Sequence, residues 1–406
     1  MTSVRLHALG VREDRGEWIV GRPDTGVCVA VPYEGMRAVQ LLQEGMTILA
    51  AQQRLRAETG ANLDVGDFVA GMAAVGLVVS IGDRVFEDVP VHRPSLPWLS
   101  AGLVRWTLSP VLHWLMAALV AGGIAAALVR PEVIPGWRTL LWMEHGTLVL
   151  LGEVAVVAVL FTLHELAHLC TARAAGVPGR IRLDTRLQFL AVQTDVSGIW
   201  LAERRVRLTV YLAGMTVDAA VLGTCLGVMA IFDPHPVPAI VALMEMTGLA
   251  LQFLVFMRTD LYFLIQDLTG CRNLYAGATA YLLYVVRRGA RRPATDPLAG
   301  LEPGERRATR LYSGLMLAGT ALCLGAFLQV SLPFTATLIG RSLGALARHD
   351  SLVATVDALA TLAVLAGYQY AWCRAWRRRH GARVRRWTAK GVARYRRPRP
   401  ADQFSR

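Results

Sequence analysis

The sequence predicts a polytopic α-helical membrane protein with about six transmembrane helices, preceded by a small N-terminal α+β domain. The main observation is composition: 54% of the 406 residues are hydrophobic, only 18% are charged, and the mean hydropathy is +0.40. Apolar segments long enough to cross a bilayer begin only after residue 105. This composition excludes a disordered chain and a collagen-like fibre.

Residues 1–90 have the composition of a soluble domain. An alternating apolar run at 27–31 predicts a strand, and three helix-like stretches and a final strand follow. Apolar side chains recur in these stretches at roughly helical spacing: Leu41, Leu42, Ile48, Leu55, Phe68 and Met72. The pattern resembles a small winged-helix domain. Prolines after residue 92 predict a linker over 91–105.

The apolar segments of spanning length are predicted at 106–129, 147–170, 208–232, 237–258, 309–330 and 351–373. The stretch 274–286 is too short to span and is predicted to be interfacial or re-entrant. Arginines gather in the loops 171–207 and 286–310, whereas the loops 130–146 and 331–350 are nearly neutral. The positive-inside rule therefore predicts a multi-pass plasma-membrane protein with both termini in the cytoplasm.

Most of the net charge of +13 lies at the C-terminus. Residues 374–406 carry twelve arginines and Lys390 against Asp402 alone, a net charge of +12. We predict a basic cytoplasmic tail that contacts anionic lipid head groups of the bilayer. No nucleic-acid partner is expected, because no folded basic groove accompanies the charge. The N-terminus lacks an apolar core after its first basic residues, so no signal peptide is expected.

The chemistry is concentrated in the second apolar segment, in the sequence HELAH at 164–168. His164 and His168 are four residues apart, so on a helix they share a face and can bind one metal ion. Glu165 can take a proton from a metal-activated water, as a catalytic residue. Buried ionisable groups in an apolar segment are functional candidates, and two imidazoles with one carboxylate leave a zinc position open.

A third ligand must come from another acid in the apolar part: Glu153, Asp218, Glu245, Asp260, Asp267 or Asp357. Glu153 precedes His164 by three helical turns, about 16 Å, which is too far for the same ion. It is expected to line a water path or to make an interhelical hydrogen bond. Asp218, in the middle of a span, and Asp260, at the end of the fourth span, remain as alternatives.

HELAH followed by ARAAGVPGRI resembles the site-2 protease family of intramembrane zinc metallopeptidases. The stretches TDVSGIWLAERRVRLTVYLAGM and RTDLYFLIQDLTGCRNLY resemble its bacterial peptide-processing branch, and the likeness covers roughly residues 105–320. The resemblance implies a protease domain over 106–373 and a Zn²⁺ ion held by His164, His168 and Asp260. It also matches Tyr262 and Asp267 to motif positions beside the ligand. Leu261 stands where the family has Gly, and Leu254-Val255 stand where it has Asn-Pro.

The N-terminal stretches LLQEGMTILAAQQRLRAETG and VGDFVAGMAAVGLVVS resemble the winged-helix leader-peptide recognition element of enzymes that process ribosomally made peptides. Such an element adds an extended leader to a sheet edge. A DNA-binding winged helix and a domain with only a packing role are the alternatives. Between residues 34 and 80 the only basic side chains are Arg37, Arg54 and Arg56, so a phosphate footprint is lacking.

The sequence therefore predicts an intramembrane zinc endopeptidase (a hydrolase) that removes the leader of a ribosomally synthesised, post-translationally modified peptide. The precursor peptide and the lipid bilayer are the expected partners. One alternative is a site-2-type protease that cleaves a membrane-anchored regulator in signalling. The other is a non-proteolytic binding or immunity protein, against which the intact HExxH motif argues.

Overall fold

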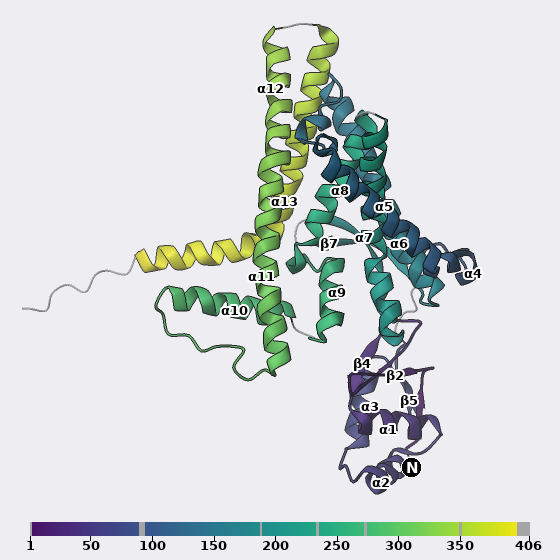
Figure 1. Ribbon diagram of the computed structural model, residues 1–406. Coiled ribbons are helices and arrows are strands. Elements are labelled where there is room, and N and C mark those ends of the chain that lie inside the picture. The colour runs from purple at the N-terminus through teal and green to yellow at the C-terminus, as the bar shows by residue number, and fades with distance from the viewer. Residues whose placement is uncertain are drawn as a thin grey trace, which may run out of the picture.

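The computed structural model describes residues 2–88, 94–186, 189–232, 235–271, 274–348 and 351–395. Strands and short helices of residues 2–88 form one part, which we call the N-terminal unit (Figure 1). Residues 94–395 form a larger, mostly helical part, which we call the helical unit. The predicted domain boundary at residue 90 and the end of the predicted tail, 396–406, lie outside the described residues.

The N-terminal unit contains two small antiparallel sheets and three helices. Its elements are β1 (Val4–Leu6), β2 (Gly10–Asp14), β3 (Glu17–Gly21), β4 (Cys28–Val31), α1 (Tyr33–Gln43), α2 (Ile48–Thr59), α3 (Val65–Ala74), β5 (Val78–Ile81) and β6 (Arg84–Val85). The strand orders are β1-β5-β6 and β2-β3-β4. Three helices and a strand thus follow the first strands, in the order expected from the sequence.

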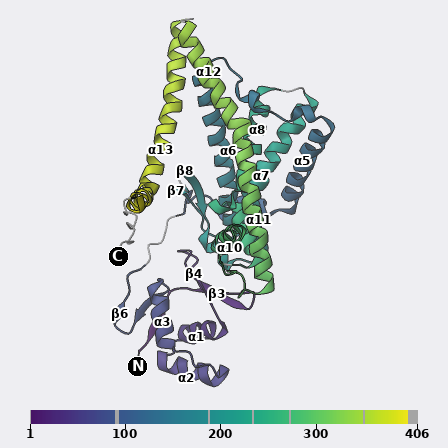
Figure 2. The ribbon, with the colours of Figure 1, turned by 90° about the vertical axis from the view of Figure 1, so that its left-hand side faces the viewer.

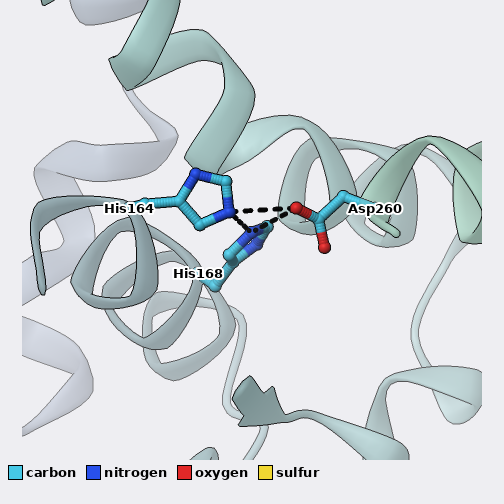
Figure 3. Close-up of side chains that lie close together, drawn as sticks. All are labelled: His164, His168 and Asp260. Atoms are coloured by element: carbon cyan, nitrogen blue, oxygen red, sulfur yellow. Dashed lines mark hydrogen bonds and ion pairs between the residues drawn. The ribbon is translucent and has the colours of Figure 1, made fainter. Parts of the chain in front are cut away.

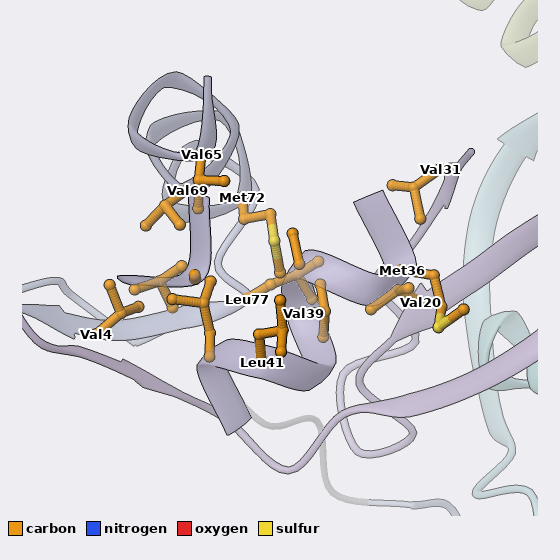
Figure 4. Close-up of a cluster of buried hydrophobic side chains, with 14 of the residues drawn as sticks. Val4, Val20, Val31, Met36, Val39, Leu41, Val65, Val69, Met72 and Leu77 are labelled. Carbon is orange, nitrogen blue, oxygen red and sulfur yellow. The ribbon is translucent and has the colours of Figure 1, made fainter. Parts of the chain in front are cut away.

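The N-terminal unit has a hydrophobic core of its own (Figure 4). Val20, Leu41, Leu55, Val69 and Leu77 are fully buried in it. All six apolar residues predicted at helical spacing contribute, because Ile48 and Phe68 pack against this core and the other four are buried. Local signals define the helix ends: the Thr47 and Asp64 side chains accept hydrogen bonds at the N-termini of α2 and α3.

The helical unit is built from long helices, one β-hairpin and short turns. Its regular elements are α4 (Ala101–Val104), α5 (Pro110–Val129), α6 (Gly146–Ala174), β7 (Arg180–Arg186), β8 (Phe189–Asp195), α7 (Arg204–Ile231), α8 (Pro236–Gln252), α9 (Asp260–Thr269), α10 (Leu274–Gly289), α11 (Pro303–Ala326), α12 (Leu332–Arg348) and α13 (Leu352–Tyr395). Its tight turns are η1 (Arg105–Leu108), η2 (Pro131–Val133), η3 (Trp137–Leu140), η4 (Ser197–Leu201), η5 (Val255–Met257) and the π-helical η6 (Phe327–Ser331).

Five helical stretches of the described chain are long and apolar enough to cross a membrane: 110–129, 146–174, 204–231, 303–348 and 352–378. The expected sixth, at 237–258, is shorter. It corresponds to α8, which has 17 residues and ends at Gln252. Its length of about 26 Å falls just below the hydrocarbon thickness of about 30 Å. The stretch 274–286 forms α10, which lies crosswise to α11 (Figures 1 and 2).

One prediction about the C-terminal third was wrong. The expected loop 331–350 is helical up to Arg348, because α11, η6 and α12 form one continuous helix of 46 residues. The proline at 333 does not break it, since the wider π-helical turn just before it relieves the clash with the preceding turn. The last expected span, 351–373, corresponds to the apolar stretch 352–378, and α13 continues beyond it to Tyr395, with its C-terminal part turned aside from α11 and α12 (Figure 1).

The expected loop 171–207 and linker 91–105 are packed structures where they are described. Strands β7 and β8 pair antiparallel as a hairpin within the expected loop (Figure 2), and Arg180 is opposite Asp195. Ser95 bonds to this region through Gly179 and Ile181, at 3.2 and 3.0 Å. Leu99 is buried against α6. The chain between the two units is therefore fixed to the helical unit from residue 94 onward.

Helices α5 and α7 approach each other at two glycines. A Cβ on Gly123 would overlap the Gly223 backbone, and a Cβ on Gly223 would overlap the Leu119 carbonyl. Small residues that allow backbones to touch are the usual basis of helix association in membranes.

We expect Gly223→Ala to lower the free energy of unfolding by about 1–3 kcal/mol, because the methyl group forces these helices apart. Gly227→Ala is the matched control, one turn later on α7, where a Cβ meets nothing within 4 Å. Higher helix propensity should leave that variant unchanged or more stable by up to about 1 kcal/mol. Thermal unfolding in detergent micelles compares the two, and equal stabilities would contradict the close approach.

Candidate metal centre

Helix α6 carries the HELAH sequence in its last third and buries three of its polar side chains. His164, Glu165 and His168 are 8%, 7% and 6% exposed. The two imidazoles project from the same face of α6 toward Asp260, the first residue of α9 (Figure 3). Asp260 Oδ2 lies 3.0 Å from His164 Nε2 and 3.3 Å from His168 Nε2. The two Nε2 atoms are 3.1 Å apart.

The opposite ring nitrogens decide how these histidines can act. His164 Nδ1 lies 2.7 Å from Asp218 Oδ2, and His168 Nδ1 lies 2.7 Å from the Val210 carbonyl oxygen. Both partners accept hydrogen bonds, so each Nδ1 carries a proton and each neutral ring presents an Nε2 lone pair. The second carboxylate and the carbonyl thereby orient both rings toward Asp260.

Three acceptor atoms therefore converge with no proton among them when the rings are neutral. His164 Nε2, His168 Nε2 and a carboxylate oxygen of Asp260 form a group that could hold a metal ion. Their separations of 3.0–3.3 Å fit the edges of a tetrahedron with metal–ligand bonds of about 2.0 Å. A cation at their centre would turn the mutual repulsion of these acceptors into attraction, so the donor set fits a metal ion.

A break between α8 and α9 brings Asp260 to the histidines. Helix α8 ends at Gln252, and the left-handed conformation of Arg258 (φ 56°) redirects the chain just before α9. The Tyr312 hydroxyl of α11 donates to the Val255 carbonyl across 3.1 Å within this break. The expected position of Asp260 at the end of a longer fourth span is therefore replaced by one at the start of a new helix.

Gln252 holds the metal-facing carboxylate and was not predicted from the sequence. Its Nε2 donates to Asp260 Oδ2, and its Oε1 accepts from the Asp260 amide, both at 3.2 Å. The Gln252 side chain is thus hydrogen-bonded to both the backbone and the side chain of Asp260. Its spacing of eight residues from Asp260 has no regular periodicity, so no sequence signal pointed to it.

Asp218, the alternative third ligand, lies on the far side of His164. It is 7% exposed and contacts Nδ1, while Asp260 contacts Nε2. A single imidazole cannot offer both nitrogens to the same ion. The structure therefore places Asp218 as the residue that orients His164, and Asp260 as the carboxylate beside both Nε2 atoms.

Gly214 of α7 forms a wall of the site, and the sequence did not single it out. A Cβ there would lie 2.5 Å from His164 Nε2 and 2.5 Å from His168 Nε2. Only a residue without a side chain leaves space beside both nitrogens.

Glu165 points to the β7–β8 hairpin. Its Oε2 accepts hydrogen bonds from the Thr194 amide and from the Thr194 hydroxyl, both at 2.6 Å. The Thr194 hydroxyl also contacts the Glu165 carbonyl at 3.1 Å. Thr194, on β8, thus fixes the orientation of this carboxylate beside the ligand cluster. Because the hairpin was expected to be a loop, Thr194 was not predicted.

The remaining predicted residues lie outside the ligand cluster. Tyr262 is buried and packs edge-on against Tyr312, with ring centroids 6.0 Å apart. Asp267 pairs with Arg207 at 2.6 Å. Glu153 lies three turns earlier on α6, and none of the described residues bonds to its buried Oε1. The structure thus brings together His164, His168 and Asp260, with Asp218 one contact away.

Comparisons of the chain with protein-family models, with curated proteins and with solved structures give no match.

We expect Asp260→Ala to abolish stoichiometric metal binding and Asp218→Asn to weaken it by about 10–100-fold. The first removes one of three ligands, whereas the second disturbs only the orientation of His164. Metal analysis of the purified proteins after equilibration with a chelator series measures both. Retention of metal by Asp260→Ala together with its loss from Asp218→Asn would reverse the assignment.

We expect Gly214→Ala to lower metal occupancy by at least tenfold, because its methyl group crowds both Nε2 atoms. The same substitution at Gly227 is the control on the same helix, away from the site. Thermal unfolding of both variants separates a local effect from a loss of the fold. Full occupancy in Gly214→Ala would show that the metal is held elsewhere.

Proposed function

We propose that this protein is a membrane-embedded zinc endopeptidase that cleaves a precursor peptide. The supporting observation is the convergence of His164, His168 and Asp260, with Glu165 adjacent to the first histidine in the same helix. Two histidines and one carboxylate also bind Fe(II) in oxygenases. The neighbouring buried Glu165 favours hydrolysis, because hydrolysis requires a base near the attacking water.

In the proposed hydrolysis, the three ligand residues, Glu165 and Thr194 have separate roles. His164, His168 and Asp260 would hold a zinc ion, which would supply Lewis-acid chemistry to the scissile carbonyl and the attacking water. Glu165 accepts a proton from that water as its oxygen bonds to the carbonyl carbon, and returns the proton to the amine nitrogen as the C–N bond breaks. Thr194 keeps the Glu165 carboxylate oriented throughout.

The apolar surroundings support an intramembrane location for this reaction. Helix α6 is one of the five stretches long enough to span, and its large exposed side chains before the motif are apolar: Leu148, Leu151, Val154, Val157, Val159, Phe161 and Leu163. An apolar exterior with a polar interior face is typical of a helix that lines a site inside a bilayer. The proposal includes a plasma-membrane location with both termini in the cytoplasm, as the loop charges predict.

The position of the N-terminal unit supports a peptide substrate captured through its leader. Strand β4 is at the edge of the sheet β2-β3-β4, where an extended peptide can pair with it. The chain just before β4 touches the helical unit, since a Cβ on Gly26 would lie 2.7 Å from Ser197 Cβ. Ser197 is three residues from Thr194, a separation of at most about 11 Å. A leader paired with β4 would therefore have one end near the segment that follows Thr194.

The charges of the N-terminal unit support a peptide more than a nucleic acid. Arg37 and Arg54 both bind the Glu58 carboxylate, at 2.7 and 2.6 Å. These ion pairs lower the pKa of Glu58 to about 2, so it stays charged at physiological pH. Two of the three basic side chains between residues 34 and 80 therefore already have an acidic partner, which leaves little charge for phosphates.

We expect Glu165→Gln to retain metal and to lose cleavage by at least about 100-fold, because an amide cannot accept the proton of the attacking water. The full-length protein in nanodiscs is incubated with each short peptide encoded near its gene as a candidate precursor, and new termini are identified by mass spectrometry. Glu144→Gln, an exposed change before α6, is the control.

The same assay separates the alternatives. Cleavage of a single-span membrane peptide but not of the precursor would favour a protease of membrane-anchored regulators. Cleavage of neither by the zinc-loaded protein, or equal cleavage by Glu165→Gln, would overturn the proposed hydrolysis. Metal analysis of the same sample identifies zinc or iron.

A further inference from the structure

Asp260 is the first residue of helix α9. At the other end of this helix, charged residues of both units form hydrogen bonds and an ion pair with it. We propose that Asp14 and Arg15 of the N-terminal unit, with Arg207 of α7, form a clamp on α9 that positions Asp260 for metal binding. We call these three residues the α9 clamp. The proposal rests on the proposed function only where it refers to the metal.

The centre of the clamp is a buried ion pair. Arg207 is 1% exposed, and its Nε and Nη2 donate to the two Asp267 carboxylate oxygens at 2.6 and 2.8 Å. Asp267 is 4% exposed. A bidentate pair of this kind fixes direction as well as distance. Breaking it would leave a buried charge without its partner, which is strongly destabilising.

The N-terminal unit completes this pair through the end of β2. Asp14 Oδ2 accepts from Arg207 Nη2 at 3.1 Å, so one guanidinium joins the two acids. Arg12, two residues earlier, bonds to the Ala202 carbonyl beside α7 and lies 3.2 Å from Asp14 Oδ1. The β2–β3 hairpin is therefore attached to the helical unit by charge-assisted hydrogen bonds.

Arg15 binds the C-terminal end of α9 directly. Its Nη2 donates to the carbonyl oxygens of Asp267 and Leu268, at 2.6 and 3.0 Å. A cation at this end also interacts favourably with the helix dipole. Gly270 follows with φ 73°, and a Cβ there would overlap the Arg15 guanidinium. Because Gly270 has no side chain, the Arg15 guanidinium can lie directly against the end of α9.

The length of α9 makes the clamp relevant to the metal site. Helix α9 has ten residues, too few to be stable by itself, so its position depends on contacts with other elements, including those at its C-terminal end. Asp260 and Asp267 are seven residues apart, almost two full turns, and face the same side about 10 Å apart along the axis. A tilt of α9 at Asp267 therefore moves Asp260 away from the two histidines.

The test uses Arg15→Asn in the full-length protein in nanodiscs. Arg15 has φ 57° in the two-residue turn Arg15-Gly16 between β2 and β3, and asparagine accepts this conformation while being too short to reach α9. Arg54→Ala is the matched control, an exposed arginine of the same unit bonded only to Glu58 among the described residues. Arg15→Lys tests rescue, because its ammonium can reach one carbonyl.

Two measurements are made on each protein. Hydrogen exchange of the metal-free protein reports α9, and competition with a chelator gives the dissociation constant for Zn²⁺. We expect Arg15→Asn to speed exchange across α9 at least fivefold and to weaken Zn²⁺ binding about tenfold. The lysine variant should recover part of both effects, and Arg54→Ala should match the wild type.

Exchange and affinity unchanged in Arg15→Asn would overturn the clamp. Faster exchange with unchanged Zn²⁺ affinity would overturn its positioning role for Asp260. A wild-type protein that binds no metal would reject the proposed function instead. In that case, exchange at residues 260–263 still decides whether Arg15 controls the far end of α9.

Discussion

The crowding of three lone-pair acceptors in an apolar helical unit is the constraint on which the other features depend. Two imidazole nitrogens and a carboxylate oxygen lie within about one hydrogen-bond length of each other. In a medium of low polarity, such a group is costly unless a cation joins it and the surrounding groups are satisfied. The Asp218 carboxylate and the Val210 carbonyl satisfy the Nδ1 atoms of His164 and His168, respectively.

The same constraint accounts for local irregularities in the fold. A continuous helix through residues 236–269 would carry Asp260 past the histidines, and the break after Gln252 avoids this. Gln252 and Tyr312 bond to groups that the break leaves near the interior. Gly214 of α7 leaves space for both imidazole rings because it has no side chain. Thr194, on the hairpin, donates a hydrogen bond to the Glu165 carboxylate. The break after Gln252 and the β7–β8 hairpin thus each supply hydrogen bonds to a carboxylate of the site.

The N-terminal unit is attached to the helical unit through a buried charged side chain, Arg207. Arg207 is fully buried, and its partners come from three segments that are far apart in the sequence: β2, α9 and the residues before α7. A side chain with several hydrogen-bond donors can join several acceptors at one point. The N-terminal unit is therefore docked on the helical unit through this arginine, and residues 94–104 of the predicted linker 91–105 pack against the helical unit.

Local sequence alone determined the features that depend on periodicity and composition. Hydropathy located the long helices, helical spacing placed His164 and His168 on one face, and the apolar pattern of residues 34–80 predicted three helices with one core. Each of these follows from interactions within a few turns of one element. The error at 331–350 arose because the apolar segment was expected to end at residue 330, whereas the helix continues to Arg348.

Only the tertiary structure decided which acid faces both Nε2 atoms and which residues support it. Asp218 and Asp260 are both plausible in sequence, and they differ because α7 meets Nδ1 of His164 while α9 meets Nε2. Gly214, Gln252, Thr194 and Arg15 act through contacts between elements distant along the chain. Such contacts depend on how helices and hairpins pack in space, and sequence periodicity carries no information about that packing.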